Sequence, residues 1–341
     1  MWDRFLRACR CEQVDATPVW FMRQAGRYMA EYRAIREKWT LLEICLQPEL
    51  AAEVTLQPVR AFSVDAAILF ADILLPLEPM GAPFHFASGE GPVVEHPVRD
   101  ASDVAALRII EPEETLPHVL QAIRILAREL AGRTPLIGFA GAPFTLASYL
   151  VEGGKSSHYV TTKRLMYEAP EVWHELMSKL AEVVRRYLRA QIAAGAQAVQ
   201  LFDSWVGALS PADYVSFVQP HVRHILADVM TTGIPVIHFG TGTATLLELQ
   251  RDAGGSVIGV DWRTPLSGAR QRLGPLALQG NLDPILLMAP RDVLRSRIKE
   301  VLVEAGPGPG HIFNLGHGIL PQTSPDQVAY SADLVHELSA R

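Results

Sequence analysis

The sequence has 341 residues, of which 49% are hydrophobic, and a formal net charge of −6 at pH 7. The length fits two average domains or one large α/β barrel, and the apolar content excludes an extensively disordered chain. The mildly negative charge argues against a nucleic acid or an anionic membrane as the partner, although a local arginine cluster can still bind an acidic ligand.

The start of the sequence has no pattern of a secretory signal. Met1-Trp2-Asp3-Arg4-Phe5 contains no basic stretch followed by an apolar run, and no later stretch approaches the ~20 apolar residues of a membrane-spanning helix. The odd number of cysteines, Cys9, Cys11 and Cys45, indicates free thiols in a reducing compartment. Cys9 and Cys11 lack the second ligand pair that a zinc site needs. We therefore expect a soluble, cytoplasmic protein.

Short apolar runs, most of them rich in β-branched or aromatic residues, recur along the chain and predict strands. They cover residues 19–22, 66–70, 135–140, 198–202, 235–239, 257–260, 276–278 and 312–315. Helical periodicity lies between them, at 48–62, 116–130 and 171–194, and further helices are expected to start at Pro211, Ala244, Pro265, Asp292 and Pro325. This alternation predicts a parallel sheet, and eight strands favour a closed (β/α)8 TIM barrel over an open sheet. Because no linker interrupts the pattern, residues 1–341 are expected to form a single domain.

Active sites of such barrels lie at the carboxyl ends of the strands. Polar residues and glycines gather at those predicted ends, in a chain of only 20% charged residues. They are Arg23, Asp72, Gly141, Pro143, Asp203, Ser204, His238, Gly240, Asp261, Asn281, Asn314 and His317.

Two arginines flank a glycine in the run Met22-Arg23-Gln24-Ala25-Gly26-Arg27-Tyr28, directly after the first predicted strand. Arg33 and Arg36 follow, with Glu31 as the one acid among them. A guanidinium presents paired donors to a carboxylate and stays charged at all relevant pH values. The alternative is a solvated helix face. The position at the barrel rim favours anion binding.

Asp65 and Asp72 stand at either end of a predicted buried strand. Asp65 is expected at the bottom of the strand or as its cap, whereas Asp72 emerges at the catalytic end. A carboxylate among apolar residues is costly unless donors reach it. Asp72 is therefore either a turn residue or a group that awaits donors on a ligand, and these residues alone do not decide between the two.

Nucleotide-binding motifs fail on inspection. The Gly154-Lys155-Ser156 ending suggests a phosphate loop, but Tyr149 stands where that motif requires glycine. The run 240–245 lacks the third glycine of the dinucleotide fingerprint, and 306–310 is a Gly-Pro turn before the last strand. His317, between Gly316 and Gly318, ends the last strand, where it is either a ligand contact or a plain turn histidine.

Taken together, these segments resemble the uroporphyrinogen decarboxylase family, and the Arg-Gln-Ala-Gly-Arg-Tyr run is highly diagnostic of it. The small departure is Met29-Ala30, where the family usually has leucine and proline, and it affects a loop. The segments that carry the resemblance are 18–28, 55–76, 138–154, 200–207, 279–284 and 314–318.

The resemblance implies an enzyme that removes four acetate carboxyl groups as CO2 from uroporphyrinogen III, giving coproporphyrinogen III in haem and porphyrin biosynthesis. It implies no cofactor and no metal, a homodimer, and no nucleic acid or membrane partner. Asp72 aligns with the family's essential aspartate. The implied substrate-binding residues are Arg23, Gln24, Ala25, Gly26, Arg27, Asp72, Tyr149, Ser204 and His317.

The chemistry of such a substrate is consistent with these residue types. Arginines supply counter-charge to its carboxylates, and the pyrrole serves as its own electron sink once a ring carbon is protonated. An ionised Asp72 at the centre of the macrocycle would accept pyrrole N–H bonds and stabilise the developing cation. Tyr149, Ser204 and His317 would hold the carboxylate arms. The proton donor stays open between Arg23, which is a poor acid, and a bound water.

Two other functions compete with this interpretation. A zinc-dependent methyltransferase of the same superfamily would need a His-x-Cys pair and a later cysteine, but the matching run is His238-Phe239-Gly240 and no cysteine follows Cys45. A non-catalytic tetrapyrrole carrier would need the arginines without Asp72 or the full rim.

Overall fold

The computed structural model describes residues 3–87 and 91–341. Met1 and Trp2, which belong to the stretch inspected for a secretory signal, lie outside this range. The helices are α1 (Arg4–Cys9), α2 (Ala30–Arg36), α3 (Leu41–Cys45), α4 (Pro48–Ala61), α5 (Leu77–Met80), α6 (Ala101–Ala106), α7 (Pro112–Thr115), α8 (Pro117–Glu129), α9 (Pro143–Glu152), α10 (Val160–Glu168), α11 (Pro170–Ala194), α12 (Pro211–Phe217), α13 (Gln219–Met230), α14 (Leu247–Ala253), α15 (Leu266–Leu273), α16 (Arg291–Ala305) and α17 (Pro325–Ser339).

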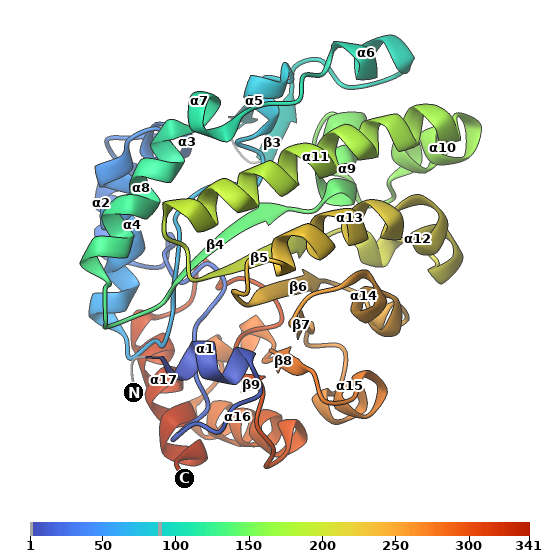
Figure 1. Cartoon of the computed structure of the whole chain (residues 1–341). Helices are drawn as coiled ribbons and strands as arrows, with labels where there is room; N and C mark the ends of the chain where they lie inside the picture. The colour runs from blue at the N-terminus through green and yellow to red at the C-terminus, as the bar shows by residue number, and fades with distance from the viewer. Residues whose placement is uncertain (1–2, 88–90) are drawn as a thin grey trace.

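Seven strands form one parallel sheet in the order β1-β4-β5-β6-β7-β8-β9, and helices lie along its outer side (Figure 1). Two more strands form an antiparallel hairpin between β1 and β4. The strands are β1 (Ala67–Ile68), β2 (Phe84–Ala87), β3 (Gly91–Val94), β4 (Leu136–Gly141), β5 (Ala198–Asp203), β6 (Val236–Gly240), β7 (Val257–Gly259), β8 (Ala277–Gln279) and β9 (His311–Ile312). The α/β class and the parallel sheet are thus confirmed, whereas the hairpin was not predicted.

The predicted first strand at residues 19–22 is wrong as a strand, and the sheet has seven strands instead of the expected eight. Val19 makes a single parallel bridge to Phe313. Beyond it, the Phe21 N–H donates to the Gln24 side chain at 3.1 Å and the Met22 N–H to the Asn314 side chain at 3.0 Å. Because side chains satisfy these amides, the backbone pairing with Phe313 does not continue past Trp20.

Proline and glycine fix the ends of the helices as expected. Pro143 and Pro170 occupy the first turns of α9 and α11, where a missing N–H costs no hydrogen bond. Gly153 ends α9 with φ 82°, a conformation that glycine adopts without strain. Within residues 3–87 and 91–341, no helix combines the length and apolarity needed to cross a membrane.

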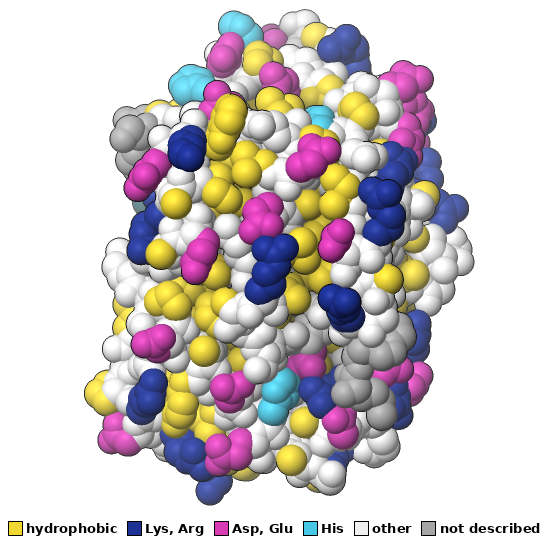
Figure 2. Space-filling view, turned by 90° about the vertical axis from the view of Figure 1, so that its left-hand side faces the viewer, with side chains coloured by type: hydrophobic (Ala, Val, Ile, Leu, Met, Phe, Trp, Pro, Cys, Tyr) yellow, Lys and Arg dark blue, Asp and Glu magenta, His cyan; other side chains and the backbone are white. Residues whose placement is uncertain are grey.

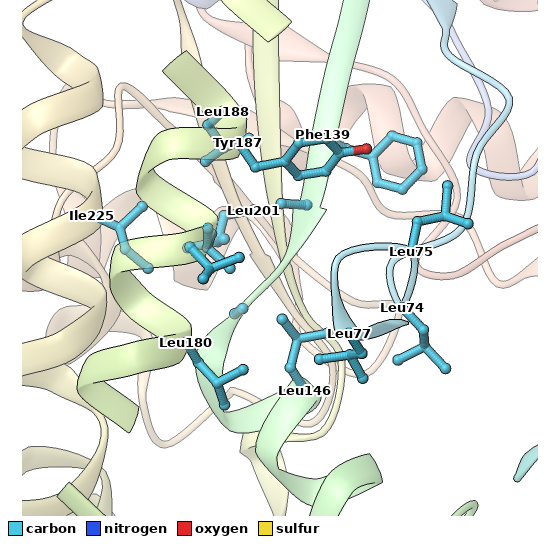
Figure 3. Packing of buried hydrophobic residues seen from close by; sticks show 14 of the residues in the cluster. Leu74, Leu75, Leu77, Phe139, Leu146, Leu180, Tyr187, Leu188, Leu201 and Ile225 are labelled. Atoms are coloured by element: carbon cyan, nitrogen blue, oxygen red, sulfur yellow. The ribbon is translucent and has the colours of Figure 1, made fainter. Parts of the chain in front are cut away.

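Two layers of buried side chains lie on the two faces of the sheet. Between sheet and helices, Leu74 from the loop after β1 and Leu77 of α5 share a cluster with Leu146 of α9, Phe139 of β4 and Leu180 of α11 (Figure 3). This packing fixes the loop that carries Asp72. The concave face holds a smaller cluster to which nearly every strand of the sheet contributes: Ala66, Ile137, Ala198, Ile237, Phe239, Val257, Ala277 and Ile312, with Trp20 and Met22.

A chain of polar side chains crosses this concave face. The Trp20 indole donates to Gln279 Oε1 at 3.0 Å, and Gln279 Nε2 donates to Gln200 Oε1 at 3.0 Å. All three side chains are buried. Buried amides of this kind are stable only when their partners are present, so the chain joins the 18–22 segment to β8 and β5.

Candidate active site

The run Met22–Tyr28 forms a loop at the carboxyl ends of the strands, which we call the arginine loop. Arg23 has φ 60°, a left-handed conformation that is rare for a residue with a side chain. Gln24 is fully buried, and its Nε2 donates to Ala66 O at 3.0 Å. The Tyr28 hydroxyl in turn donates to Gln24 O at 2.6 Å. The Gln24 side chain therefore anchors the loop and is turned away from solvent.

Arg33 of α2 hydrogen-bonds to the backbone of the same loop. Its Nη1 donates to the carbonyls of Arg27 at 3.0 Å and of Tyr28 at 2.9 Å. Arg36 donates to Trp39 O at 3.3 Å. Arg33 thus positions the arginine loop through the backbone.

The Arg23 side chain lies across Gly318. A β-carbon added at Gly318 would overlap Arg23 Cδ and Cγ, so only glycine allows this approach. Among the described residues, no side chain forms a hydrogen bond or an ion pair with the Arg23 guanidinium. Its charge nevertheless lowers the pKa values of Asp72, Tyr149 and His317, as set out below. Arg23 therefore lies close enough to these three predicted site residues for its charge to act on each of them.

Asp72 is half-buried in a turn after β1. Its Oδ1 accepts the Leu74 N–H at 2.9 Å. Burial raises the pKa of this carboxyl above its usual range, while the Leu74 N–H and the Arg23 charge oppose the rise. The bond from Leu74 shows that Asp72 is a turn residue, and the role of a carboxylate that awaits donors on a ligand stays a prediction.

Tyr149 of α9 faces an aromatic neighbour that was not predicted. Its ring centroid lies 6.1 Å from that of Trp205, and Tyr159 lies 6.2 Å from Trp205 on another side. Burial raises the pKa of Tyr149, and the Asp72 charge adds to the rise, while Arg23 lowers it. Its hydroxyl is therefore protonated at neutral pH and available as a donor.

His317 lies between two glycines beside Arg23. Burial lowers its pKa to about 4, and the charges of Arg23 and Arg263 contribute to the lowering. At neutral pH the imidazole is uncharged, so positive charge in this part of the site comes from the arginines.

The predicted site residues are thus only partly brought together. Arg23, Asp72, Tyr149 and His317 converge, and half-buried Ser204 precedes the aromatic Trp205. Arg27 is exposed, and its charge acts on Tyr32. Ala25 and Gly26 are half-buried between the two arginines.

Several polar residues at the strand ends serve the scaffold instead of the site. Asn281 Nδ2 donates to Asp261 O at 2.7 Å and to Thr264 O at 2.6 Å. His238 alternates with Ile237 and Phe239 of the concave cluster, so it faces the helices, where its Cβ would lie 3.2 Å from a β-carbon added at Gly255.

The Asp203 carboxyl, next to Ser204, is buried, which the sequence did not predict. Asp203 is fully buried, accepts one bond from Thr145 Oγ1 at 3.3 Å, and leaves Oδ2 without a partner among the described residues. Burial raises its pKa to about 7. Asp203 ends β5 on the side of Val199 and Leu201, which face the helices, so only Ser204 and Trp205 follow the strand toward the site.

Metal binding has no obvious place in the part of the chain that the structure describes. There, no three His, Cys, Asp or Glu side chains are grouped so as to hold an ion. Cys9, Cys11 and Cys45 are free, and burial raises the pKa of each thiol.

Comparisons with known proteins assign the family. The family model described as uroporphyrinogen decarboxylase (URO-D) matches residues 2–338. Uroporphyrinogen decarboxylases of Sorangium cellulosum and Carboxydothermus hydrogenoformans are 69% and 61% identical over 339 residues, or 99% of this chain and 97% of each relative. That of Thermus thermophilus is 55% identical over 338 residues, with 99% and 98% covered.

Among solved structures, a methyltransferase from Methanosarcina mazei has the same fold. It superposes with a TM-score of 0.82 over 98% of this chain and 97% of that one, at 21% identity. This identity is low enough that the likeness concerns the fold alone. The match over the whole sequence is decisive for the family: the chain belongs to the uroporphyrinogen decarboxylase family.

Proposed function

We propose that this chain removes the four acetate carboxyl groups of uroporphyrinogen III as CO2, giving coproporphyrinogen III, and that Asp72 stabilises the protonated pyrrole. Its family makes the chain a carboxy-lyase that decarboxylates uroporphyrinogen in porphyrin biosynthesis. The observation that carries the site assignment is the convergence of Asp72, Tyr149 and His317 on Arg23.

The proposed chemistry needs a stabilised cation. A proton adds to a pyrrole carbon, the bond between the arm's CH2 and its CO2 breaks, and the released electron pair neutralises the ring cation. The ring proton then leaves and the CH2 takes up a proton, so one proton replaces each CO2. An ionised Asp72 interacts more strongly with the cationic ring than with the neutral substrate, and this difference lowers the barrier.

The remaining residues of the proposed site bind and orient the substrate. Arg23 and Arg27 act as counter-ions to carboxylate arms, with the backbone of Gln24, Ala25 and Gly26 between them. The protonated Tyr149 hydroxyl, the Ser204 hydroxyl and the neutral His317 imidazole donate or accept hydrogen bonds at other arms. Asp72 and His317 are half-buried whereas Arg23 and Arg27 are exposed, which supports a site that is open to a large, multiply charged substrate at its rim.

We also propose that residues 18–20 complete the sheet as a closed (β/α)8 barrel in a single domain, residues 1–341. Phe313 N donates to Pro18 O at 2.8 Å on one side, and Asp65 N donates to Val19 O at 2.7 Å on the other. These bonds support closure between β9 and β1. Hydrogen exchange should then protect the Phe313 and Asp65 amides as well as those of β4, and unfolding should be a single transition.

We propose further that the protein is a homodimer in the cytoplasm. It would act without a cofactor or a metal and would bind neither nucleic acid nor a membrane. The free cysteines fit a reducing compartment. On the face in Figure 2, basic and acidic side chains are interspersed among apolar ones, without the single-sign basic surface that nucleic acids favour. Light scattering after size exclusion tests the dimer.

Turnover under anaerobic conditions tests the activity itself. Purified protein treated with a strong chelator should convert uroporphyrinogen III to coproporphyrinogen III, identified by product mass, at its original rate. Binding without any loss of CO2 would indicate a carrier instead, and activity that needs added zinc would contradict the cofactor-free proposal.

A further inference from the structure

The turn after β7 brings a third arginine to the site. Asp261, Trp262 and Arg263 follow that strand at the same end of the sheet as Asp72. This turn packs closely on the loop that carries His317, since a β-carbon added at Gly316 would lie 2.9 Å from Trp262 Cβ and would overlap Trp262 N. The two loops are therefore held together by backbone contact.

Two neighbours fix the Arg263 guanidinium. Its Nη1 lies 2.6 Å from Asp261 Oδ2, and its Cζ lies 3.9 Å from the centroid of the Trp262 ring. Asp261 is itself fixed, because it is 1% exposed and accepts the Gly242 N–H at 2.6 Å. A stacked and paired guanidinium loses little freedom on binding a further ligand.

The Arg263 head group retains donors for such a ligand. Its side chain is 55% exposed, and among the residues the structure describes Asp261 is its only ion-pair partner. A guanidinium has five N–H donors, and the contact with Asp261 occupies one edge at most. The other donors remain available to a planar, two-oxygen anion.

Arg263 also lies near the centre of the site. Its charge and that of Arg23 both lower the pKa of His317, so the imidazole has two guanidinium neighbours. The Asp261 carboxylate, which pairs with Arg263, opposes this lowering, but the two guanidiniums outweigh it, so an anion bound beside His317 would face a net positive charge.

We propose that Arg263 is a substrate-binding residue that holds one carboxylate arm of the tetrapyrrole together with His317. Asp261 and Trp262 are positioning residues that hold its guanidinium at the mouth of the site. This inference rests on the proposed function, because it takes uroporphyrinogen as the ligand. It adds a residue outside the arginine loop to the counter-ions of the substrate.

The experiment compares Arg263→Gln and Arg263→Lys with Arg297→Gln. Arg297 is a matched control on α16, since it is 54% exposed and pairs with Glu300 at 2.7 Å, much as Arg263 does with Asp261. Arg263→Gln should raise KM for uroporphyrinogen about tenfold or more, while kcat changes by less than about threefold. Arg263→Lys should give a smaller rise in KM because it keeps charge but loses the fork. Arg297→Gln should match wild type.

Direct titration with uroporphyrinogen and coproporphyrinogen separates binding from folding. A weaker Kd for both ligands assigns Arg263 to a propionate arm, and a weaker Kd for uroporphyrinogen alone assigns it to an acetate arm. Unchanged KM and Kd in both Arg263 variants would overturn the inference. If Arg263→Gln proves unstable in thermal unfolding, Arg263→Lys carries the test with the same outcomes.

A second measurement tests the pairing with His317. In Arg263→Gln, NMR titration should show the imidazole pKa of His317 rising from about 4, because one of its two cationic neighbours is gone. The double variant Arg263→Gln/His317→Gln should bind more tightly than the sum of the single losses predicts, because both side chains hold one arm. Additive losses would contradict a shared arm.

The failure of this inference can be told apart from the failure of the proposed function. If wild type does not turn over uroporphyrinogen at all, the proposed function is wrong. If wild type turns it over normally and the Arg263 variants behave like wild type, only the role of Arg263 is rejected.

Discussion

At the amino-terminal end of the sheet, Arg4 donates to Asp15 at 2.8 Å and to Asp65 at 2.7 Å, and His336 contacts Asp65 at 2.7 Å. At the carboxyl end, Arg23 and Arg27 have no ion-pair partner among the described residues. Both ends gather arginine and both hold an ion pair, Arg4 with Asp65 at one end and Arg263 with Asp261 at the other, but only the carboxyl end also has the arginines Arg23 and Arg27 that no described carboxylate pairs. Paired and desolvated charges hold a fold in place, whereas unpaired guanidiniums around a half-buried carboxylate are available to a ligand.

The largest expected effect lies at the paired end. Asp65→Ala leaves Arg4 with one partner fewer and removes the acceptor of the Val19 N–H, 2.8 Å away. Because the Arg4 and Asp65 side chains are only 14% and 10% exposed, the free energy of unfolding should fall by ~3–5 kcal/mol. Denaturant unfolding measures it.

The control for this prediction is an exposed ion pair on the outer helices. Arg295→Ala breaks a 2.9 Å contact with Glu337, with side chains 48% and 62% exposed, and should cost less than ~1 kcal/mol. If Asp65→Ala and Arg295→Ala lower the free energy of unfolding equally, burial does not make the Arg4–Asp65 ion pair more important than an exposed one.

At the unpaired end, Asp72→Asn should affect chemistry more than folding. The amide keeps the size of the side chain but loses the charge that favours the protonated pyrrole, so kcat should fall ~10²–10³-fold while Kd changes little. Single-turnover rates and anaerobic titration measure the two effects. Asp100→Asn is the control, since Asp100 accepts the Ser102 N–H at 2.8 Å in a similar turn far from the site. A variant retaining more than about a tenth of wild-type turnover would rule out Asp72 as the electrostatic centre.

Arg27 should show a smaller effect, confined to binding. Arg27→Lys keeps the charge but loses the planar fork, so Kd for uroporphyrinogen should rise by several-fold, or ~1 kcal/mol. Arg27→Ala should weaken binding further. Titration with coproporphyrinogen, which has four fewer carboxylates, shows which arm is involved, because only an acetate contact discriminates between the two. If neither variant weakens the binding of either ligand, Arg27 is a solvated surface residue and does not bind substrate.

The last effect, which appears only as pH rises, is a change in the pH dependence of stability. The pKa of Asp203 is about 7 in the fold against 3.8 as the ordinary value, so the folded state binds a proton that the unfolded state releases across that window. Its contribution to stability is therefore lost as pH rises from about 4 to 7. Buried His238 and His311, with pKa lowered to about 4, contribute the opposite slope between pH 4 and 6.5.

Asp203→Asn should remove the unfavourable slope. Relative to wild type, the variant should gain up to ~4 kcal/mol in the free energy of unfolding at pH 8, the equivalent of a shift from 3.8 to about 7, and little at pH 4. Thermal or denaturant unfolding at several pH values measures this difference. An equal change at both pH values would mean that the Asp203 carboxyl does not titrate in this range.

Much of this organisation was predictable because it depends on local patterns. The runs that became β4, β5 and β6 are mostly apolar, as strands buried on both faces require, although Gln200 and His238 interrupt two of them. Asp65 lies at the bottom of its strand, as expected, and Asp72 lies at the top. The convergence of Arg23, Asp72 and His317 followed from parallel strand ends, which meet at one edge.

What the sequence did not predict depends on contacts between distant segments. The stretch 19–22 has the composition of a strand, but the side chains of Gln24 and Asn314 take its amides. Gln24 was predicted to bind substrate, yet its side-chain amide donates to the Ala66 carbonyl within the fold. Arg263 was overlooked because its place beside His317 depends on the contact between Gly316 and Trp262, which no local pattern encodes.

The ion cluster at the amino-terminal end also bears on how the chain is made. Asp65 and His336 are separated by 271 residues, and Thr17 N donates to Ser339 Oγ across 322 residues. At ~5–20 residues per second, a ribosome finishes α17 roughly 15–55 s after it has added Asp65. Throughout that interval α1 and the 18–20 segment lack β9 and α17 as partners, and their apolar side chains stay uncovered. During synthesis the apolar side chains at this end of the molecule, opposite the arginine loop, therefore stay uncovered until the last helix is made.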